Sequence, residues 1–391
     1  MKKKIDILFV LIDVGFTLEN SSVFQSQVGN QMLNLADLGY EVGIISSYKN
    51  RDLFDQKIGN KLKLNGIKLF LVKKNFFLFE LLTMIFTLTS LLFKYDIKNY
   101  YCRSFWGAIV TKFSLFYKFK NLVYDVRADA LDEYRSVNMK KWKIFIYMFL
   151  ENWGIKNSST VLAVSKSLAQ TVKKRFNISK VYTIPCCIDS KEFEVNKEEI
   201  SALKNKLNFK DSDIVFVYSG GLGHYQKIPL LLEIWKYFLK YDYIKFLFLT
   251  NQDPRKHPAT FNEINPFDDR LIHFSLDRKD VPKYLNCADI GFMLRDSRDL
   301  NKAASPVKFP EYLACNLKVV ASPGIGDVSD CIIKNDCGIL IDTLSVDDGI
   351  KNLQNLVFKL LKDKNNKTTN KIPLRNYLWQ NYSEIYKEIY N

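Results

Sequence analysis

The sequence predicts a parallel α/β protein with two domains and a closing helix. Short apolar runs, of the length of buried strands, alternate with helical patterns along most of the chain. The alternation stops in the polar, charged stretch 189–212 and then restarts. A length of 391 residues suits two domains of roughly 150–200 residues each. We therefore expect domains at 1–190 and 191–370, followed by a C-terminal helix at 371–391.

The first half alternates expected strands with helices over 22–38 and 140–158. The strands are expected at 5–12, 41–47, 67–72, 97–103, 121–127, 160–165 and 181–193, the last ending in a turn. The second half repeats the pattern, with strands at 213–220, 244–250, 271–275, 289–295, 318–322 and 337–342. Helices are expected there at 228–240, 279–287 and 306–315. Apolar residues at helical spacing predict a last amphipathic helix over 374–391.

Charge and cysteine usage limit the classes of partner. The chain has 57 Lys and Arg against 42 Asp and Glu, a net charge of +15, which favours polyanionic partners such as phosphate-bearing substrates or an anionic membrane. The positive charge is scattered and no nucleic-acid-binding module is evident, so nucleic acid is not an expected partner. Seven cysteines without a CxxC pattern, together with three histidines, predict reduced cytosolic thiols and no metal site.

The N-terminal sequence MKKKIDILFVLIDVGF imitates a secretory signal peptide. Its apolar run is short, carries Asp6 and Asp13, and lacks a small-residue cleavage site. We expect a first buried strand that ends at a glycine turn.

The segment 76–93 is apolar, has 18 residues and is flanked by Lys73, Lys74 and Lys94. Its polar residues form one stripe at helical spacing: Glu80, Thr83, Thr87 and Ser90. Three interpretations stay open: a helix that packs in the core, a helix that lies on an anionic lipid surface, and a spanning helix near the lower length limit.

Two glycine turns follow expected strands, where ligands bind in doubly wound sheets. Gly15 lies in LIDVGFTLENSS, and an ordinary loop is an equal interpretation there. Gly221 and Gly223 lie in YSGGLGHYQK, where glycines would let the backbone approach a diphosphate, with Lys227 as a charge partner. The alternative for this second loop is a plain tight turn.

Two further stretches carry charges where elements begin or end. Asp125 and Arg127 in VYDVRADALDEY end a strand, and they would either face a ligand or join a surface ion-pair cluster. In SPVKFPEYLACNLKVVASPGIGD, Ser305 is an expected helix cap and Pro306 suits the first turn. Lys308 and Glu311 would share one helix face. They would bind a diphosphate and vicinal hydroxyls, or form a surface pair.

In combination, these stretches resemble the family-4 glycosyltransferases, which have the GT-B fold. The resemblance rests on SGGLGHYQK, ADIGFML, SPVKFPEYLACNLKVVASPGIGD and VLAVSKSLAQTVKKRF followed by IPCCID, and it covers nearly the whole chain. It implies two Rossmann-like, doubly wound domains that face a cleft, with a C-terminal crossover helix packed back on the N-terminal domain. YDVRADALDEY also looks like a motif of members that build bacterial surface polysaccharide.

The resemblance implies a retaining transfer of a sugar, without metal or cofactor, from a nucleotide-sugar on the C-terminal domain to an acceptor on the N-terminal domain. Glu311 would bind the ribose and Lys308 the diphosphate, with Gly15, Gly221, Gly223, Lys227, Ser305 and Pro306 as further donor contacts. Asp125 and Arg127 would orient the acceptor hydroxyl, and with Lys308 they are the expected catalytic residues. The acceptor is expected to be a lipid-linked glycan or oligosaccharide at the cytoplasmic face of an anionic membrane.

Two positions depart from the family pattern. The first glutamate of the family's pair falls at Ala303, eight positions before Glu311, and a basic residue often found after the loop glycine falls near Leu222. Two other functions remain open. A non-catalytic nucleotide-sugar-binding scaffold would explain Ala303, and a GT-B nucleotide-sugar epimerase would require more acid and base groups than three histidines provide.

Overall fold

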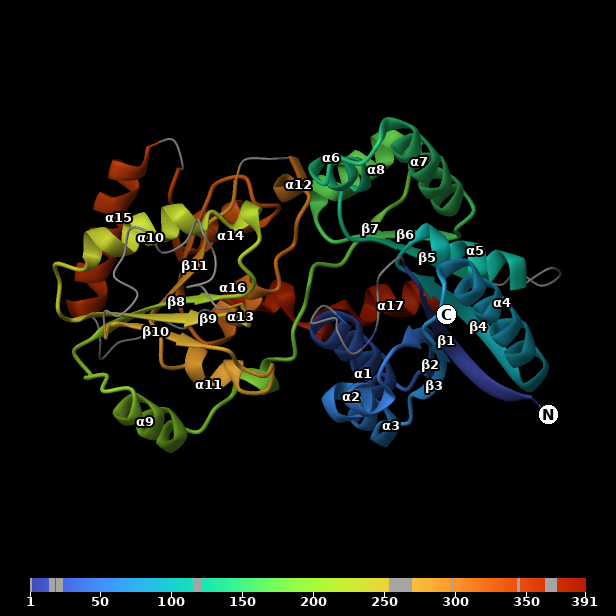
Figure 1. Cartoon of the computed structure of the whole chain (residues 1–391), viewed down its shortest axis with the longest axis horizontal. Coiled ribbons are helices and arrows are strands. Elements are labelled where there is room, and N and C mark those ends of the chain that lie inside the picture. Colours follow the sequence, from blue (N-terminus) through green and yellow to red (C-terminus); the bar gives the residue numbers. More distant parts are fainter. Residues whose placement is uncertain are drawn as a thin grey trace. The chain divides into compact units, whose positions relative to one another are not determined.

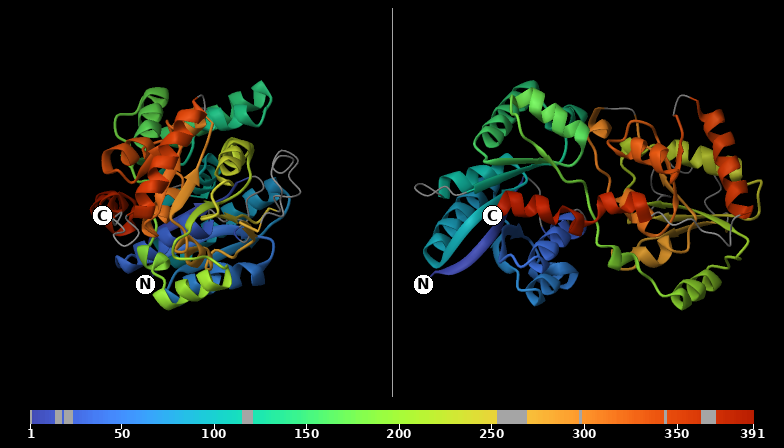
Figure 2. Two further views of the ribbon diagram at one scale, coloured as in Figure 1. Left: turned by 90° about the vertical axis from the view of Figure 1, so that its left-hand side faces the viewer. Right: turned by 180° about the vertical axis from the view of Figure 1, so that it is seen from behind.

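The computed structural model describes residues 2–13, 18, 24–114, 121–252, 269–296, 299–342, 345–362 and 371–391. The chain forms two compact units (Figures 1 and 2). The N-terminal unit comprises Met1–Cys186 and Trp379–Asn391, and the C-terminal unit comprises Cys187–Leu378. Each unit is built on one parallel sheet, as the sequence predicts.

Within the described residues, the sheet of the N-terminal unit has the order β3-β2-β1-β4-β5-β6-β7. The strands are β1 (Lys3–Leu11), β2 (Val42–Tyr48), β3 (Lys68–Lys73), β4 (Tyr95–Cys102), β5 (Asn121–Val126), β6 (Thr160–Ala163) and β7 (Tyr182–Thr183). The apolar N-terminal run forms the central strand β1, which pairs with β2 and β4 and is buried from Ile5 onward. Strands covered on both faces need such continuous apolar runs.

Helices cover both faces of this sheet, because the chain adds strands in one direction from β1 to β3 and in the opposite direction from β4 onward. In Figure 1, α1 and α17 lie on one side and α4 and α5 on the other. The helices are α1 (Asn30–Asp37), α2 (Arg51–Phe54), α3 (Asn60–Leu64), α4 (Phe77–Lys94), α5 (Phe105–Ser114), α6 (Ala130–Ser136), α7 (Lys141–Lys156), α8 (Lys166–Phe176) and α17 (Ser383–Tyr390), with π-helical turns at Phe24–Gly29 and Asp55–Gly59 and a 3₁₀ turn at Trp379–Tyr382.

The C-terminal unit repeats the topology, with the order β10-β9-β8-β11-β12-β13 among its described residues. The strands are β8 (Ile214–Ser219), β9 (Ile244–Leu249), β10 (Leu271–Phe274), β11 (Ile290–Met293), β12 (Lys318–Ala321) and β13 (Gly338–Leu340). Its helices are α9 (Lys197–Lys206), α10 (Ile228–Phe238), α11 (Val281–Leu285), α12 (Asp299–Lys302), α13 (Lys308–Ala314), α14 (Val328–Asn335), α15 (Val346–Lys362) and α16 (Lys371–Leu374), with 3₁₀ turns at Ser190–Phe193, His224–Gln226 and Arg375–Tyr377.

Alternate residues of β8 point into two different hydrophobic cores, as the period of two along a strand requires. Phe216 packs on α10 and α15, and Val217 packs on the opposite face with α11, α13 and α14. Tyr312 of α13 reaches under the sheet, where its hydroxyl accepts the Ser219 N–H at 3.0 Å and donates to the Phe292 carbonyl at 3.2 Å. This contact fixes α13 against the carboxyl ends of β8 and β11.

The C-terminal segment differs from the single helix predicted over 374–391. It divides into α16, two 3₁₀ turns and α17. The break occurs at Leu378, which has extended backbone angles and forms a parallel bridge with Ile188, whose N–H donates to the Tyr377 carbonyl at 2.8 Å. This pairing takes the backbone groups that a continuous helix would need. The chain passes from one unit to the other between Cys186 and Cys187 and between Leu378 and Trp379. The boundaries predicted at 190 and 370 lie four and eight residues away.

Helix α4 packs on the unit with one face only, so the core-packing and lipid-contact interpretations of 76–93 both remain open. By length and composition alone it is long and apolar enough to cross a membrane, and 28% of it is buried. Its inner face contains the buried Glu80, whose carboxylate lies 3.2 Å from Lys74 Nζ. The hydroxyls of Thr83 and Thr87 donate to backbone carbonyls four residues earlier, at 2.7 and 2.8 Å. The two threonine hydroxyls are therefore satisfied by the helix backbone, whereas Glu80 Oε2 is buried with only the ion pair to Lys74 among the described residues.

Candidate functional site

The strand orders place candidate residues at one edge of each sheet. In both units the first and fourth strands are neighbours, and in such sheets ligands bind at the carboxyl ends of these strands. The neighbours are β1 and β4 in the N-terminal unit, and β8 and β11 in the C-terminal unit. The predicted Gly221 and Gly223 follow β8, and Asp125 ends β5. Gly15 lies outside the described residues.

The glycine loop after β8 lies against a cation. Gly220 has φ +138°, a conformation that L side chains rarely adopt, and a Cβ atom there would lie 3.0 Å from Lys308 Nζ. Gly221 has open space, since a Cβ atom there would meet only Gln252 Oε1 at 3.6 Å. The structure thus brings the loop and Lys308 together, as the donor-site prediction requires.

Two side chains hold this loop in place. The Tyr218 hydroxyl donates to the Gly221 carbonyl, and Gln252 Oε1 accepts the Leu222 N–H, both at 2.5 Å. Leu222 itself is only 2% exposed and packs in the core. The position that often carries a basic residue in the family resemblance is therefore a core position in this chain.

Lys308 is buried without a carboxylate in contact. Its Nζ donates to Gln226 Oε1 at 3.2 Å and lies 4.3 Å from the centroid of the Tyr218 ring, while no ion pair joins it to a described residue. Burial, and then the nearby Arg295 guanidinium, lower the pKa of Lys308 to about 7, although Glu311 opposes this shift. An anion at this position would favour the charged ammonium.

Glu311 is 3% exposed, and its carboxylate is paired with Arg278. Burial lowers the pKa of Arg278, but Glu311 outweighs burial and raises it. Nη2 of Arg278 is buried without a hydrogen-bond partner among the described residues. Lys308 and Glu311 are thus buried with separate partners, and the alternative of a surface pair between them is wrong.

The start of α13 differs from the prediction. The helix begins at Lys308, with Val307 as an N-cap that provides no side-chain hydrogen bond, so Ser305 is not the cap and Pro306 precedes the first turn. The expected cap fails because Val307 already has helical backbone angles. Ser305 and Pro306 are therefore neighbours of the Lys308 site and not part of a helix N-terminus.

Arg295 is a basic residue of this site that the sequence reasoning missed. It follows β11, its backbone N–H donates to Ser322 Oγ at 2.9 Å and its Nη1 donates to Asn301 Oδ1 at 3.3 Å. The guanidinium carbon lies 5.4 Å from the centroid of the Tyr225 ring. Its position at a strand end was a signal that could have found it, whereas Arg278, in the loop before α11, gave no such signal.

Two other positions singled out from the sequence, Lys227 and Ala303, make fewer contacts that bear on a ligand site. Lys227 has φ +44° and directly precedes α10, and its side chain makes no hydrogen bond or ion pair with a described residue. Ala303, the position of the missing glutamate, is 4% exposed. Among the described residues, no group of three or more His, Cys, Asp or Glu side chains is placed to hold a metal ion.

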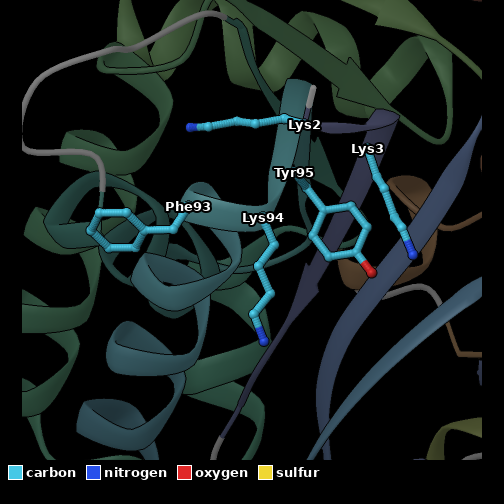
Figure 3. A pocket seen from close by; sticks show the side chains of 5 residues that line it. All are labelled: Lys2, Lys3, Phe93, Lys94 and Tyr95. Carbon is cyan, nitrogen blue, oxygen red and sulfur yellow. The ribbon is translucent and has the colours of Figure 1, made fainter.

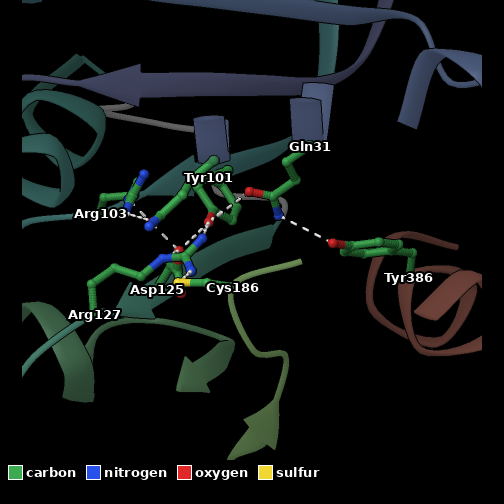
Figure 4. Close-up of polar contacts among 8 residues, drawn as sticks. Gln31, Tyr101, Arg103, Asp125, Arg127, Cys186 and Tyr386 are labelled. Atoms are coloured by element: carbon green, nitrogen blue, oxygen red, sulfur yellow. Dashed lines mark hydrogen bonds and ion pairs between the residues drawn. The ribbon is translucent and has the colours of Figure 1, made fainter. Parts of the chain in front are cut away.

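In the N-terminal unit, Asp125 is the centre of a buried polar cluster (Figure 4). It is 2% exposed, and Oδ2 accepts hydrogen bonds from Arg127 Nε at 2.5 Å and from the Tyr101 hydroxyl. Arg127 Nη2 also donates to the Tyr101 oxygen at 3.4 Å. Gln31 Oε1 lies 3.1 Å from the same hydroxyl, and its Nε2 donates to Tyr386 of the C-terminal segment. The alternative of a surface ion-pair cluster is wrong for Asp125.

A second arginine, Arg103, follows β4 and was also missed. Its Nε lies 3.8 Å from Asp125 Oδ2, and its Nη2 donates to Gln27 Oε1 at 3.2 Å. Burial and the Arg127 guanidinium lower the pKa of Arg103. Burial acts in the same direction on Arg127, but Asp125 outweighs it and raises the pKa of Arg127. The Asp125 carboxylate therefore interacts more strongly with Arg127 than with Arg103.

The other acidic residues near this stretch have their own partners. Asp129 caps α6 by accepting the Leu131 N–H at 3.1 Å and pairs with Arg175 at 2.5 Å. Asp132 lies 3.7 Å from Arg135. These are structural ion pairs, in contrast to the cluster around Asp125.

The fold and the sequence together define a chain of the GT-B class. Residues 199–372, within the C-terminal unit, match the family described as Glycosyl transferases group 1. A solved glycosyltransferase from Rickettsia africae superposes with a TM-score of 0.72, at 15% identity over 100% of this chain and 98% of that one. HepE of Anabaena, solved in complex with UDP and glucose, gives a TM-score of 0.68 at 15% identity, with 99% and 98% covered.

A Bacillus subtilis (strain 168) protein, TuaH, named as a teichuronic acid biosynthesis glycosyltransferase, is 24% identical over 241 residues. The match covers 61% of this chain and 53% of that protein, so the chain spans about half the length of this relative. The comparisons confirm the predicted pair of Rossmann-like domains, and the C-terminal unit is similar in sequence to the group 1 glycosyl transferases.

Proposed function

We propose that the chain is a retaining, metal-independent glycosyltransferase that moves a hexosyl group from a nucleotide-sugar to a lipid-linked glycan, without a cofactor. TuaH, named for teichuronic acid biosynthesis, supports a role in surface polysaccharide. HepE, solved with UDP and glucose, supports a nucleotide-sugar donor.

The observation that carries the proposal is the buried Lys308 against the glycine loop. An ammonium out of water, without a carboxylate in contact, is costly unless an anion joins it. Arg295 adds a second cation close enough to lower the pKa of Lys308. The charge of Glu311 is taken by Arg278. A diphosphate, with two negative charges, matches these two cations.

In the transfer, the bond between the anomeric carbon and the diphosphate oxygen breaks, a bond from the acceptor oxygen forms on the same face, and the acceptor hydroxyl proton passes to the departing diphosphate. Negative charge develops on the leaving diphosphate, where Lys308 and Arg295 would stabilise it as preorganised charges. Glu311 would accept hydrogen bonds from the ribose hydroxyls. Asp125 and Arg127 would orient the acceptor hydroxyl.

Thermal shifts against UDP-, GDP-, dTDP-, CMP- and ADP-sugars test the donor site. We expect one nucleotide to stabilise the wild type and to lose its effect in Lys308→Gln and Glu311→Ala. Lys206→Gln is a matched control, since Lys206 is exposed on α9. No stabilisation by any nucleotide-sugar would contradict the proposal. Stabilisation without transfer to any acceptor would favour the scaffold, for which the buried Ala303 is the specific observation.

We further propose that the protein is cytoplasmic and works on an anionic membrane. Helix α5 packs on both α4 and α7, and all three expose large apolar side chains. The exposed fractions include 73% for Phe86 on α4, 55% for Phe113 on α5 and 75% for Phe145 on α7. Exposed aromatic residues with lysines at the helix ends are typical of helices that lie in a lipid interface.

A basic hollow lies at the carboxyl end of α4 (Figure 3). It is lined by Lys2, Lys3, Phe93, Lys94 and Tyr95. Phe93 is 78% exposed beside these lysines. The hollow therefore combines an apolar anchor with charges that suit phosphate headgroups.

Vesicle sedimentation tests the membrane location. Phe86→Ser with Phe145→Ser should lower binding to vesicles containing phosphatidylglycerol at least about tenfold, because each buried aromatic side chain contributes roughly 1.5–3 kcal/mol. Leu64→Ser on α3 is the matched control, because Leu64 is 87% exposed and apolar but lies on a different helix. Equal binding by the double variant and the wild type would contradict this location.

A further inference from the structure

The cluster at the carboxyl ends of β4 and β5 contains more positive than negative charge. Two arginines, Arg103 and Arg127, share the carboxylate of Asp125. Both guanidiniums are mostly buried, with 15% of each side chain exposed. Among the described residues, no other carboxylate pairs with either arginine. Counting the described residues alone, the cluster therefore has one more cation than it has carboxylates.

Arg103 is that cation. Arg127 donates to Asp125 through Nε, to Tyr101 through Nη2 and to the Cys186 sulfur through Nη1 at 3.8 Å. Arg103 has one hydrogen bond, from Nη2 to Gln27 Oε1, and its Nε lies 3.8 Å from Asp125 Oδ2. Of the five N–H donors of its guanidinium, four have no hydrogen-bond partner among the described residues.

The donors of Arg103 are not sealed in the core. In the described part of the chain, none of its nitrogens is among the buried atoms that lack a hydrogen-bond partner, and 15% of its side chain is exposed. Figure 4 shows the Arg103 guanidinium at the margin of the cluster, beside the Tyr101–Asp125 contact. The position follows β4, next to the central strand, where ligands of a doubly wound sheet bind.

We propose that Arg103 and Arg127 form a subsite for an anionic group, a carboxylate or a phosphate, on the acceptor. An anion placed on the free edge of Arg103 would complete the charge balance of the cluster and accept paired N–H donors. Asp125 and Tyr101 are then positioning residues, which hold Arg127 beside Arg103. This inference rests on the proposed function, since it specifies the class of acceptor.

Two sources of such an anion can be separated with small probes. Methyl β-D-glucuronide carries a sugar carboxylate, and methyl β-D-glucoside is its neutral partner. Geranyl diphosphate carries the charge of a lipid diphosphate, and geraniol is its neutral partner. Binding is measured by titration calorimetry on the full chain, with Lys308→Gln as the background for the diphosphate, so that the C-terminal unit does not bind it.

We expect one anionic probe to bind at least about tenfold more tightly than its neutral partner, because charge-assisted hydrogen bonds are the strong ones. Arg103→Gln should remove this preference, and Arg103→Lys should restore part of it. The probe that binds identifies the source as a sugar carboxylate or a lipid diphosphate. Equal binding of charged and neutral probes, or an unchanged preference in Arg103→Gln, would overturn the subsite.

The failure of this inference is distinguishable from failure of the proposed function. Arg103→Gln should keep the full thermal shift with the nucleotide-sugar, because the donor residues belong to the C-terminal unit. That retained shift also shows that the variant is folded. If wild type gives no nucleotide-sugar shift, the proposed function fails; if the shift is present and the acceptor probes show no preference, only the subsite fails.

Discussion

The two sheets share one strand order, but their carboxyl-end clusters balance charge differently. In the C-terminal unit, the carboxylate of Glu311 is taken by Arg278, and Lys308 is left with neutral partners. In the N-terminal unit, Asp125 is shared by two arginines, and most donors of Arg103 remain available. In our proposals, the same topology thus places Lys308 and Arg295 to bind a diphosphate in one unit, and Arg103 and Arg127 to bind a carboxylate or phosphate in the other.

The largest expected effect removes the cation of the C-terminal cluster. Lys308→Gln should lower the turnover of sugar transfer by about 10²–10³-fold, because one preorganised charge at the leaving group is lost. Rates are measured with the nucleotide-sugar found in the panel. A loss below tenfold, or an equal loss in Lys206→Gln, would show that Lys308 does not stabilise the leaving group.

The next effect concerns stability. Glu311→Gln leaves the mostly buried Arg278 without its carboxylate, so the free energy of unfolding should fall by about 3 kcal/mol. Urea unfolding measures it. Glu199→Gln breaks an exposed pair with Lys283 at 2.8 Å and should cost much less, because solvent and salt screen exposed pairs. Equal losses of stability in the two variants would contradict the claim that burial makes Arg278 depend on Glu311.

For a buried glutamate that has no ion pair with a described residue, a change to glutamine should raise the free energy of unfolding, whereas Glu311→Gln should lower it. Glu151 on α7 accepts the Tyr124 hydroxyl at 2.7 Å, and burial raises its pKa to about 7, with Asp13 and Glu133 adding to the rise. The folded state then favours the protonated acid, so the wild type loses stability as pH rises from about 4.5 through 7.

Glu151→Gln has no such loss. It should be about 2 kcal/mol more stable than wild type at pH 8.5 and nearly equal to it at pH 4.5. Unfolding at several pH values measures the difference. A constant difference between variant and wild type across this range would contradict the raised pKa.

The smallest effect tests the glycine loop. Gly220→Ala forces a side chain into φ +138° and places its Cβ 3.0 Å from Lys308 Nζ, so it should cost about 1 kcal/mol and weaken nucleotide-sugar binding several-fold. Gly66→Ala in the N-terminal unit also places a side chain at a positive φ of +76°, with no described atom within 4 Å, and is the control. If both variants bind the donor like wild type, the loop does not set the position of Lys308.

The sequence predicted the elements well because buried parallel strands need continuous apolar runs, and β1 and β8 are such runs. It also led to the prediction, through spacing and the family resemblance, that Lys308 and Glu311 bind the donor, and the structure shows that both are buried. It did not predict the break at Leu378, because a bridge to Ile188, distant in sequence, overrides the helical pattern there.

The partners of the site residues were harder to find from the sequence. Arg278 meets Glu311, and Arg103 meets Asp125, only through tertiary packing across 33 and 22 positions of the chain. Arg295 and Arg103 each follow a strand, which is a position typical of ligand-binding residues. This signal alone is weak, because many charged residues follow strands. Only the tertiary structure shows that Arg103 lies near Asp125 and Arg295 near Lys308.

The most direct test of the account is calorimetric titration of the nucleotide-sugar at pH 6 and pH 8.5. A nucleotide-sugar diphosphate keeps its charge over this range, whereas the pKa of Lys308 lies at about 7. We predict that wild type binds roughly tenfold more weakly at pH 8.5, with proton uptake, and that Lys308→Gln binds weakly at both values. Tight, pH-independent binding that Lys308→Gln leaves unchanged would contradict the central claim that Lys308 holds the diphosphate.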